Sequence, residues 1–285
     1  MKISVIIPNL NSPIVDQTIQ SIKVQSLDQT NFEIIVVGVD DRGIVDESPV
    51  VQFEHTEHPL PPGAARNRGV EKARGELIAF IDADCIADKN WLRSLSENFQ
   101  DSSIGIVGGG VDFDKQNVWT LALNISGFHE YLTSTPAGTR IQLPTINLMV
   151  RKDLFTQIGG FDEGRFIGED SDFTMRVRKM GYSLYFDPTA IVTHKTQRTR
   201  LTDLLSYEFH RGKHSVRFDP SHKEDYGFPP IVGTRIGLLL SAPFFASAIT
   251  GRIFSKNPAL RRYWHSIPAV LIAKLAWCMG AVTHN

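Results

Sequence analysis

Three short apolar runs, each followed by a stretch with helical spacing, constrain this chain more than any other feature. Ile3–Ile7, Phe32–Val37 and Glu76–Ile81 are rich in β-branched residues and have the length of buried strands. Helices are expected over residues 12–27, 63–75 and 89–99. Alternation of strand and helix predicts an α/β fold with a mostly parallel sheet flanked by helices. Such sheets bind ligands at the carboxyl ends of their strands.

The remainder of the chain is less regular. Between residues 108 and 194 the clearest element is a helix from about Asp170 to Met180, closed by Gly181. We therefore expect one domain over residues 1–215, with a ligand-binding half to residue 110 and a more variable half over 111–215. Residues 216–285 are expected to form a separate helical tail.

Charge and cysteine content exclude several classes of protein. The 285 residues hold 30 Lys and Arg against 31 Asp and Glu, so the basic excess typical of nucleic-acid binding is missing and no nucleic-acid partner is expected. Two cysteines, Cys85 and Cys278, indicate reduced thiols rather than a disulfide framework. The apolar run before Pro8 is too short for a signal peptide, which favours a cytoplasmic location.

Asp82 and Asp84 form the first candidate site, because they follow the apolar run 76–81 directly. Two carboxylates at this spacing can share one divalent cation, and hard oxygen ligands suit Mg²⁺ or Mn²⁺. Such a cation neutralises a diphosphate and stabilises it as a leaving group. A triplet of this kind also occurs by chance in surface loops, so its weight comes from the strand before it and the helix after it.

Glu169, Asp170 and Asp172 open the helix expected near residue 170. Carboxylates at a helix N-terminus are stabilised electrostatically whether or not they catalyse anything, so capping is one interpretation. The other interpretation is a general base, a carboxylate that takes a proton from an attacking hydroxyl group.

Two further groups of residues leave alternatives open. His194 follows the strand-like run 189–193 and is either a structural histidine or a metal ligand. Arg66 and Arg68 lie at the start of the helix over residues 63–75 and can pair with phosphate or form surface ion pairs.

The tail differs in character from the rest of the chain. After Asp225 there is no acidic residue, and the apolar stretches 236–251 and 267–282 are each shorter than the roughly 20 residues that span a bilayer. Six cations and the aromatic residues Tyr263, Trp264 and Trp277 fit a membrane surface, where Lys, Arg and aromatic side chains are favoured. We therefore expect, on the inner face of the cell membrane, either amphipathic helices lying in the interface or a shallow hairpin; packing against the domain or a partner is the alternative.

Taken in order, these motifs resemble the family 2 glycosyltransferases. The matching segments are 4–8 with Asn11, 63–69, 75–84, 159–162, 168–173 with Arg176, and His194. The resemblance covers roughly residues 1–215. It implies the GT-A fold and an inverting, metal-dependent, hexosyltransferase-like enzyme that moves a sugar from a nucleotide diphosphate-sugar to an acceptor hydroxyl. A UDP-sugar donor, Mn²⁺ or Mg²⁺, and a glycan or lipid-linked acceptor of surface polysaccharide or glycolipid synthesis are expected with it.

The resemblance also assigns roles to single residues. Asp170 matches the catalytic base, while Asp84 and His194 match the groups that hold the metal. Pro8, Asn11, Asp40, Arg68 and Asp82 fall at donor-binding positions. Glu169, Asp172 and Arg176 are expected to support the site.

One departure from the family pattern concerns the nucleobase. Relatives place an aspartate that recognises the base directly after the second strand, where this chain has Gly38. We expect Asp40 to take that role from a shifted loop. The departure keeps a non-catalytic nucleotide-sugar-binding or membrane-scaffold protein as an alternative. A sugar nucleotidyltransferase is disfavoured, because the segment 8–12 lacks the glycines and lysine of a triphosphate-binding loop.

Overall fold

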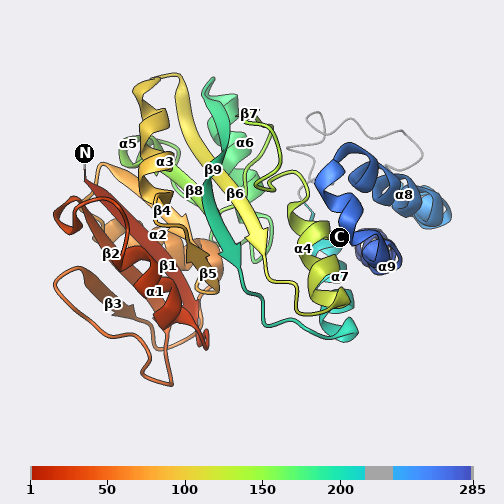
Figure 1. The fold of residues 1–285 in the computed structure, drawn as a ribbon, viewed down its shortest axis with the longest axis horizontal. Helices are drawn as coiled ribbons and strands as arrows, with labels where there is room; N and C mark the ends of the chain where they lie inside the picture. Colours follow the sequence, from red (N-terminus) through yellow and green to blue (C-terminus); the bar gives the residue numbers. More distant parts are fainter. Residues whose placement is uncertain (1, 216–233, 284–285) are drawn as a thin grey trace. The chain divides into compact units, whose positions relative to one another are not determined.

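The computed structural model describes residues 2–215 and 234–283, which fall into two compact units (Figure 1). One unit is Met1–Asp112 together with Tyr131–Lys195, and the other is Phe113–Glu130 together with Thr196–Asn285. The predicted functional boundary after residue 215 stays a prediction. Below, the first is called the sheet unit and the second the helical unit.

A single nine-stranded sheet organises the strands of the described chain. The strand order is β3-β2-β1-β4-β8-β6-β9-β5, and β7 pairs with β9. The strands are β1 (Ile3–Leu10), β2 (Phe32–Val39), β3 (Val51–His55), β4 (Leu77–Ile81), β5 (Cys85–Ala87), β6 (Ile104–Phe113), β7 (Gly138–Thr139), β8 (Asn147–Arg151) and β9 (Ser183–His194).

The predicted α/β fold is confirmed, but the sheet is mixed rather than mostly parallel. β1 pairs in parallel with β2 and β4, and β2 pairs in parallel with β3. β8 runs antiparallel to β4 and β6, and β9 runs antiparallel to β5 and β7. The parallel half is the part where strands and helices alternate in the sequence. The direction of the later strands depends on long connections, which residue periodicity does not encode.

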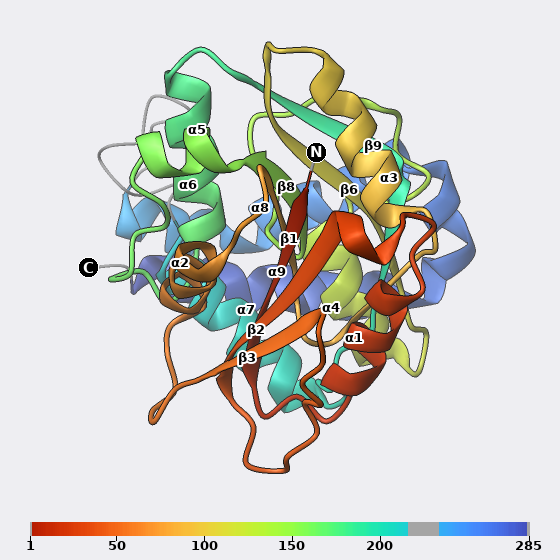
Figure 2. The same cartoon turned by 90° about the vertical axis from the view of Figure 1, so that its left-hand side faces the viewer.

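Helices cover both faces of the sheet (Figure 2). α1 (Val15–Lys23) and α3 (Trp91–Glu97) lie on one face, and α2 (Pro62–Lys72), α5 (Lys152–Gln157) and α6 (Glu169–Lys179) lie on the other. The short 3₁₀ turns η1 (Gln29–Asn31) and η2 (Asn98–Gln100) complete the connections. The α2 helix approaches β1 closely because Gly69 faces the sheet; a Cβ there would lie 2.4 Å from the Ile6 side chain.

Four phenylalanines fix α6 and the loop before it against the sheet. Phe80 of β4 contacts Phe155 and Phe161 with ring centroids 5.8 and 5.3 Å apart, and Phe173 of α6 lies 4.7 Å from Phe161. All four are buried. Because offset and edge-to-face aromatic contacts are directional, this cluster sets where α6 begins.

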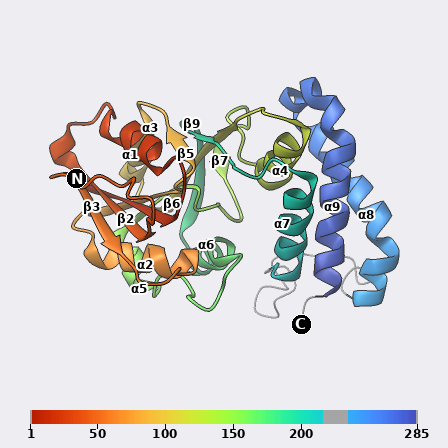
Figure 3. The same ribbon diagram turned by 90° about the horizontal axis from the view of Figure 1, so that it is seen from below.

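The helical unit is built around its last helix. It contains α4 (Val118–Phe128), α7 (Leu201–Lys213), α8 (Arg235–Lys256), the 3₁₀ segment η5 (Pro258–Ser266) and α9 (Ile267–Val282). α9 lies between α7 and α8 and also contacts α4 (Figure 3). Glycines bring α7 and α9 together, because a Cβ at Gly212 would lie 1.9 Å from the Trp277 carbonyl oxygen and one at Gly280 would lie 1.8 Å from that of Phe209.

The expectation that both apolar stretches of the tail are too short to cross a bilayer is wrong. α8 has 22 residues, and η5 with α9 spans the 25 residues Pro258–Val282 with a kink at Tyr263; both are long and apolar enough by length and composition. The prediction counted only the uncharged residues, whereas α8 continues past Arg252 to Lys256 and is not ended by Pro243.

Substituting Gly212 tests the contact between α7 and α9. In the Gly212→Ala variant the methyl group meets a backbone carbonyl that cannot rotate away, so we expect a loss of about 2 kcal/mol or more in the free energy of unfolding. Gly251→Ala on α8 is the matched control, since nothing lies within 4 Å of a Cβ there and alanine favours helix by about 1 kcal/mol. Circular dichroism during thermal unfolding distinguishes the two variants; equal melting temperatures would contradict the close contact.

Candidate active site

The loop that carries Asp82 and Asp84 is held rigidly between β4 and β5. Ser12 Oγ and Thr18 Oγ1 both donate to the Ala83 carbonyl oxygen, at 2.8 and 3.0 Å. These hydroxyl groups come from the segment after β1 and from α1. The triplet is therefore an anchored turn at the end of a buried strand, and the interpretation as a chance surface loop does not describe it.

Asp84 and His194 are brought together by strand pairing. β5 and β9 are antiparallel with Cys85 opposite His194, and the Lys195 amide donates to the Asp84 carbonyl oxygen at 2.8 Å. This register places His194 Nε2 3.4 Å from Asp84 Oδ2. His194 is buried, and the Asp84 side chain is one-quarter exposed. The predicted pair of metal-holding residues is thus adjacent and open on the aspartate side.

The donor set of this pair fits a divalent cation that also binds substrate. Mn²⁺ accepts carboxylate oxygen and imidazole nitrogen, and ions of this kind are commonly held by one or two protein groups together with phosphate oxygens. No group of three or more His, Cys, Asp or Glu side chains suited to a metal occurs among residues 2–215 and 234–283.

Arg66 links Asp82 to the start of α6. One of its terminal nitrogens lies 2.7 Å from Asp82 Oδ1 and the other 2.8 Å from Glu169 Oε1. The Arg66 side chain is only 4% exposed. Burial alone would lower the pKa of Arg66, but the Asp82 and Glu169 carboxylates outweigh it and raise that pKa. The guanidinium is thus permanently charged and forked between two elements far apart in the sequence.

The two carboxylates at the start of α6 have different environments. Burial first, and then the neighbouring Asp170 charge, raise the pKa of Glu169 to about 7, although Arg66 acts in the opposite direction. Asp170 is half-buried, and its Oδ1 accepts a hydrogen bond from the Ser171 amide at 2.7 Å. Glu169 is occupied by Arg66, so Asp170 is the more accessible of the two to a substrate.

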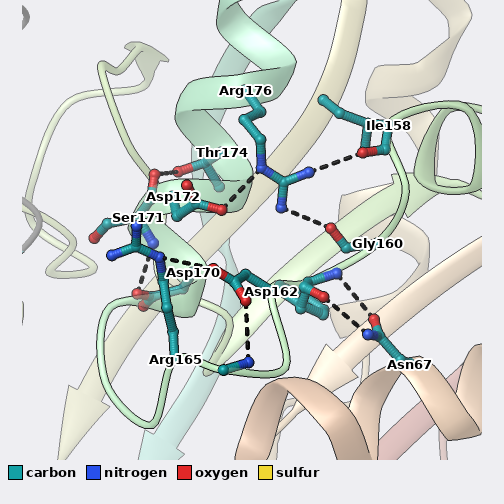
Figure 4. A network of polar contacts seen from close by, with 12 residues as sticks. Asn67, Ile158, Gly160, Asp162, Arg165, Asp170, Ser171, Asp172, Thr174 and Arg176 are labelled. Atoms are coloured by element: carbon teal, nitrogen blue, oxygen red, sulfur yellow. Dashed lines mark hydrogen bonds and ion pairs between the residues drawn. The ribbon is translucent and has the colours of Figure 1, made fainter. Parts of the chain in front are cut away.

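Asp172 and Arg176 hold the loop that precedes α6 (Figure 4). Arg176 Nε donates to Asp172 Oδ2 at 2.8 Å, and its other two nitrogens donate to the carbonyl oxygens of Ile158 and Gly160 at 2.8 and 2.7 Å. Asn67 of α2 exchanges two hydrogen bonds with the Phe161 backbone, each 2.9 Å long. These contacts hold the loop before α6 in place, so Asp172 and Arg176 stabilise the structure around the site.

Asn11 and Asp40 lie at the ends of β1 and β2. Asn11 has a positive φ of 54° and is fixed by Asp41, through hydrogen bonds of 2.7 Å in both directions. Asp40 Oδ2 accepts from the Val45 amide at 2.7 Å, while Asp40 Oδ1 is buried and accepts no hydrogen bond within the described part of the chain. A buried carboxylate oxygen of this kind favours a ligand donor. Pro8 lies three residues before Asn11, in β1 opposite Val37.

The strand geometry explains why residue 38 is a glycine. Gly38 has φ +135°, and a Cβ there would lie 2.0 Å from the Asn9 carbonyl oxygen. Neither that angle nor that space admits an aspartate. The acidic residues that follow β2 are consequently displaced to Asp40 and Asp41.

The two arginines at the start of α2, Arg66 and Arg68, have different partners. Arg68, expected at the donor, pairs with Glu54 of β3, with its Nε 2.8 Å from Oε1, and is 44% exposed. The sequence pattern predicts either a phosphate contact or a surface ion pair for Arg66. It does not predict the buried bridge to Asp82 and Glu169. The signal was present, because Arg66, Gly69 and Val70 share the buried face of α2 at helical spacing.

Residues 4–159 match the sequence profile described as glycosyl transferase family 2. The chain belongs to this family and is a glycosyltransferase. Glycosyltransferase AglE of Haloferax volcanii is 28% identical over 227 residues, which cover 75% of this chain and 73% of that protein. The O-antigen chain rhamnosyltransferase RfbN of Salmonella typhimurium is 23% identical over 94% of this chain and 92% of its own.

A solved structure confirms the GT-A fold. The mannosyltransferase PcManGT from Pyrobaculum calidifontis, in complex with GDP-Man and Mn²⁺, superposes with a TM-score of 0.65. The superposition covers 98% of this chain and 85% of that one at 16% sequence identity. The predicted family and fold class are thereby confirmed.

Removing Arg66 tests its bridging contact. Arg66→Met leaves Glu169 and Asp82 without their buried partner, so we expect a loss of about 3 kcal/mol in the free energy of unfolding. Glu169→Gln in the same chain should restore part of that loss, because it removes the buried charge that has lost its partner. Arg68→Met is the matched control and should cost less than about 1 kcal/mol, since that ion pair is solvent-exposed. Urea unfolding of wild type and the three variants supplies the comparison, and equal losses at positions 66 and 68 would rule the bridge out.

Proposed function

We propose that this glycosyltransferase is metal-dependent and moves a sugar from a nucleoside diphosphate-sugar to an acceptor hydroxyl with inversion at the anomeric carbon. One observation carries the proposal. Arg66 bridges Asp82, in the loop of the Asp84–His194 pair, to Glu169, the neighbour of Asp170. This arrangement links a metal-binding loop to an accessible carboxylate.

Asp84 and His194 would hold the divalent cation, Mn²⁺ or Mg²⁺. When bound, the cation neutralises the donor diphosphate and stabilises it as a leaving group. The carboxylates of Asp82 and Glu169 lie at the two ends of the Arg66 bridge, and those of Asp84 and Asp170 are their close sequence neighbours. Acidic side chains gathered in this way favour a bound cation. The Mn²⁺ in the mannosyltransferase structure supports the choice of metal.

Asp170 would act as the general base. As the acceptor oxygen attacks the anomeric carbon, Asp170 takes the hydroxyl proton, and the bond from that carbon to the diphosphate oxygen breaks. The nucleoside diphosphate leaves with both electrons of that bond. Asp170 is favoured over Glu169 because it is more exposed and Glu169 is engaged by Arg66.

Pro8, Asn11 and Asp40 would line the nucleobase end of the donor site. The free buried oxygen of Asp40 is suited to accept from a base N–H group, and a UDP-sugar is the proposed donor. Arg68 would bind the nucleotide only after leaving Glu54, since the two are paired here.

We further propose a glycan or lipid-linked acceptor at the cytoplasmic face of the cell membrane, in the synthesis of surface polysaccharide or glycolipid. The likeness to the O-antigen chain rhamnosyltransferase supports this class of acceptor. The two long apolar helices of the tail support a membrane surface as a partner.

Asp170→Asn tests the general base. It should lower the rate of sugar transfer by about 10²-fold to 10⁴-fold while donor binding is retained, because the amide cannot take the proton. The matched control is Asp153→Asn, since Asp153 also lies in a first helical turn and accepts from the next amide at 2.7 Å, as Asp170 does. Release of nucleoside diphosphate and calorimetric donor binding measure the two quantities. Full transfer by the Asp170 variant would contradict the assignment. If the wild-type protein bound donor but transferred no sugar, the non-catalytic alternative would hold instead.

Asp84→Asn tests the metal site. For the wild type, Mn²⁺ should strengthen binding of UDP-sugars, and the melting temperature should rise when both are present. The variant should lose at least about tenfold of that Mn²⁺-dependent affinity, because a charged oxygen ligand is removed. Asp88→Asn, in the loop after β5, serves as the control. Binding of UDP- and GDP-sugars is measured for each variant with and without Mn²⁺. If Mn²⁺ strengthened binding as much in Asp84→Asn as in the wild type, the metal site would be rejected.

A further inference from the structure

The last helix of the chain is an interior element of the helical unit. α9 contacts α4, α7 and α8, and its Lys274 is buried with Nζ donating to the Ser126 carbonyl oxygen at 3.0 Å. Gly280 lies directly against the Phe209 backbone of α7. These contacts bury Val270, Ala273, Cys278 and Ala281 of α9, while Ile267 and Met279 near its two ends are exposed.

α8 has two faces of different kinds. Its inner face packs on α9, where Leu238 and Ala242 form a core with Cys278 and Ala281. Its outer face carries a row of exposed residues spaced four apart. The row consists of Ile236, Leu240, Phe244, Ala248, Arg252 and Lys256.

The outer row changes from apolar to basic along the helix. Ile236, Leu240 and Phe244 are 73%, 72% and 81% exposed, with Leu239 beside them at 46%. Each step of four residues turns by only about 40° around a helix, so Ile236, Leu240 and Phe244 form one apolar surface. The same drift places Arg252 and Lys256 on the adjoining exposed side of α8. Large apolar side chains gathered at this exposure indicate an interaction surface rather than isolated exceptions.

Charge identifies the kind of partner. Residues 226–285 contain no Asp or Glu, and Arg252, Lys256, Arg261 and Arg262 are exposed. Trp264 follows them and is 71% exposed. A basic, acid-free surface next to an apolar one, with an exposed tryptophan, complements an anionic lipid headgroup layer.

The contacts within the helical unit decide how α8 meets lipid. Its 22 residues are long enough to cross a bilayer. However, α9 is packed on α8 and α7 is packed on α9 at Gly212, and α7 carries Asp203, Arg211 and Lys213. Moving α8 and α9 into hydrocarbon would either take these charges along or break the glycine contact, and both are costly.

We propose that α8 lies in the plane of an anionic phospholipid bilayer, with Ile236, Leu240 and Phe244 inserted and Arg252 and Lys256 on the headgroups. This inference rests on the membrane surface proposed above and specifies its residues and its mode. α9 stays within the protein. The inserted face would reach roughly 5–10 Å into the bilayer, as interfacial helices do.

Vesicle sedimentation with the full chain tests the proposal. Wild type should bind vesicles of phosphatidylcholine with phosphatidylglycerol, and Phe244→Glu should weaken binding tenfold or more, because an inserted aromatic side chain is replaced by an anion. Leu205→Glu is the matched control on α7, exposed but away from the row, and should bind like wild type. Arg252→Gln with Lys256→Gln should lose roughly 30-fold of the affinity for anionic vesicles and little for vesicles of phosphatidylcholine alone.

The outcomes separate this proposal from its alternatives. Absence of wild-type binding, or unchanged binding by Phe244→Glu, would overturn it. A wild-type dimer in solution that Phe244→Glu converts to monomers, without vesicle binding, would assign the face to a second copy of the chain and also overturn it. The rate of sugar transfer to a soluble acceptor without vesicles should be equal in wild type and Phe244→Glu. This assay therefore tests the proposed chemistry separately from membrane binding.

Discussion

The forked ion pair of Arg66 is the interaction on which the rest of the site depends. It fixes Asp82, at the end of a buried strand, to Glu169, at the start of a helix about ninety residues further along the chain. A buried charge pair of this kind is weak evidence for stability but strong evidence for specific geometry, because neither carboxylate can be left alone in the interior. Asp84 lies close to one end of this bridge and Asp170 close to the other. Because both ends are fixed, the two aspartates are held in defined positions at the surface of the site.

The site is built from rigid parts on every side. Strand register places His194 beside Asp84, hydroxyl groups anchor the intervening loop, and a phenylalanine cluster with Arg176 seats the start of α6. Groups that react or bind substrate are more precisely placed on such elements than on free loops. The proposed nucleobase end is different, since Asn11, Asp40 and Asp41 belong to strand ends and the loop that follows.

The fold class could be predicted from the sequence, because apolar runs ended by Pro8 or Asp82 locate the first strands. The ordered motifs predict roles for Asp84, Asp170 and His194; the structure places Asp84 beside His194, and the roles stay predictions. Strand direction beyond β5 and the length of α8 were not accessible, because long connections and tertiary contacts determine them. The partner of Arg66 was also beyond reach, since pairing across a hundred residues needs coordinates, although the buried face of α2 pointed to that residue rather than Arg68.

The close approach of Gly38 to the Asn9 carbonyl has a consequence for how this enzyme could diversify. A position with no room for any side chain cannot be altered to change which nucleobase is accepted. Variation is instead directed to the surface segment from Asp40 to Val45, where residues can be exchanged or inserted without disturbing the parallel strands. Under the proposed donor site, selectivity for the base and integrity of the sheet fall to separate residues, so the first can evolve while the second stays fixed.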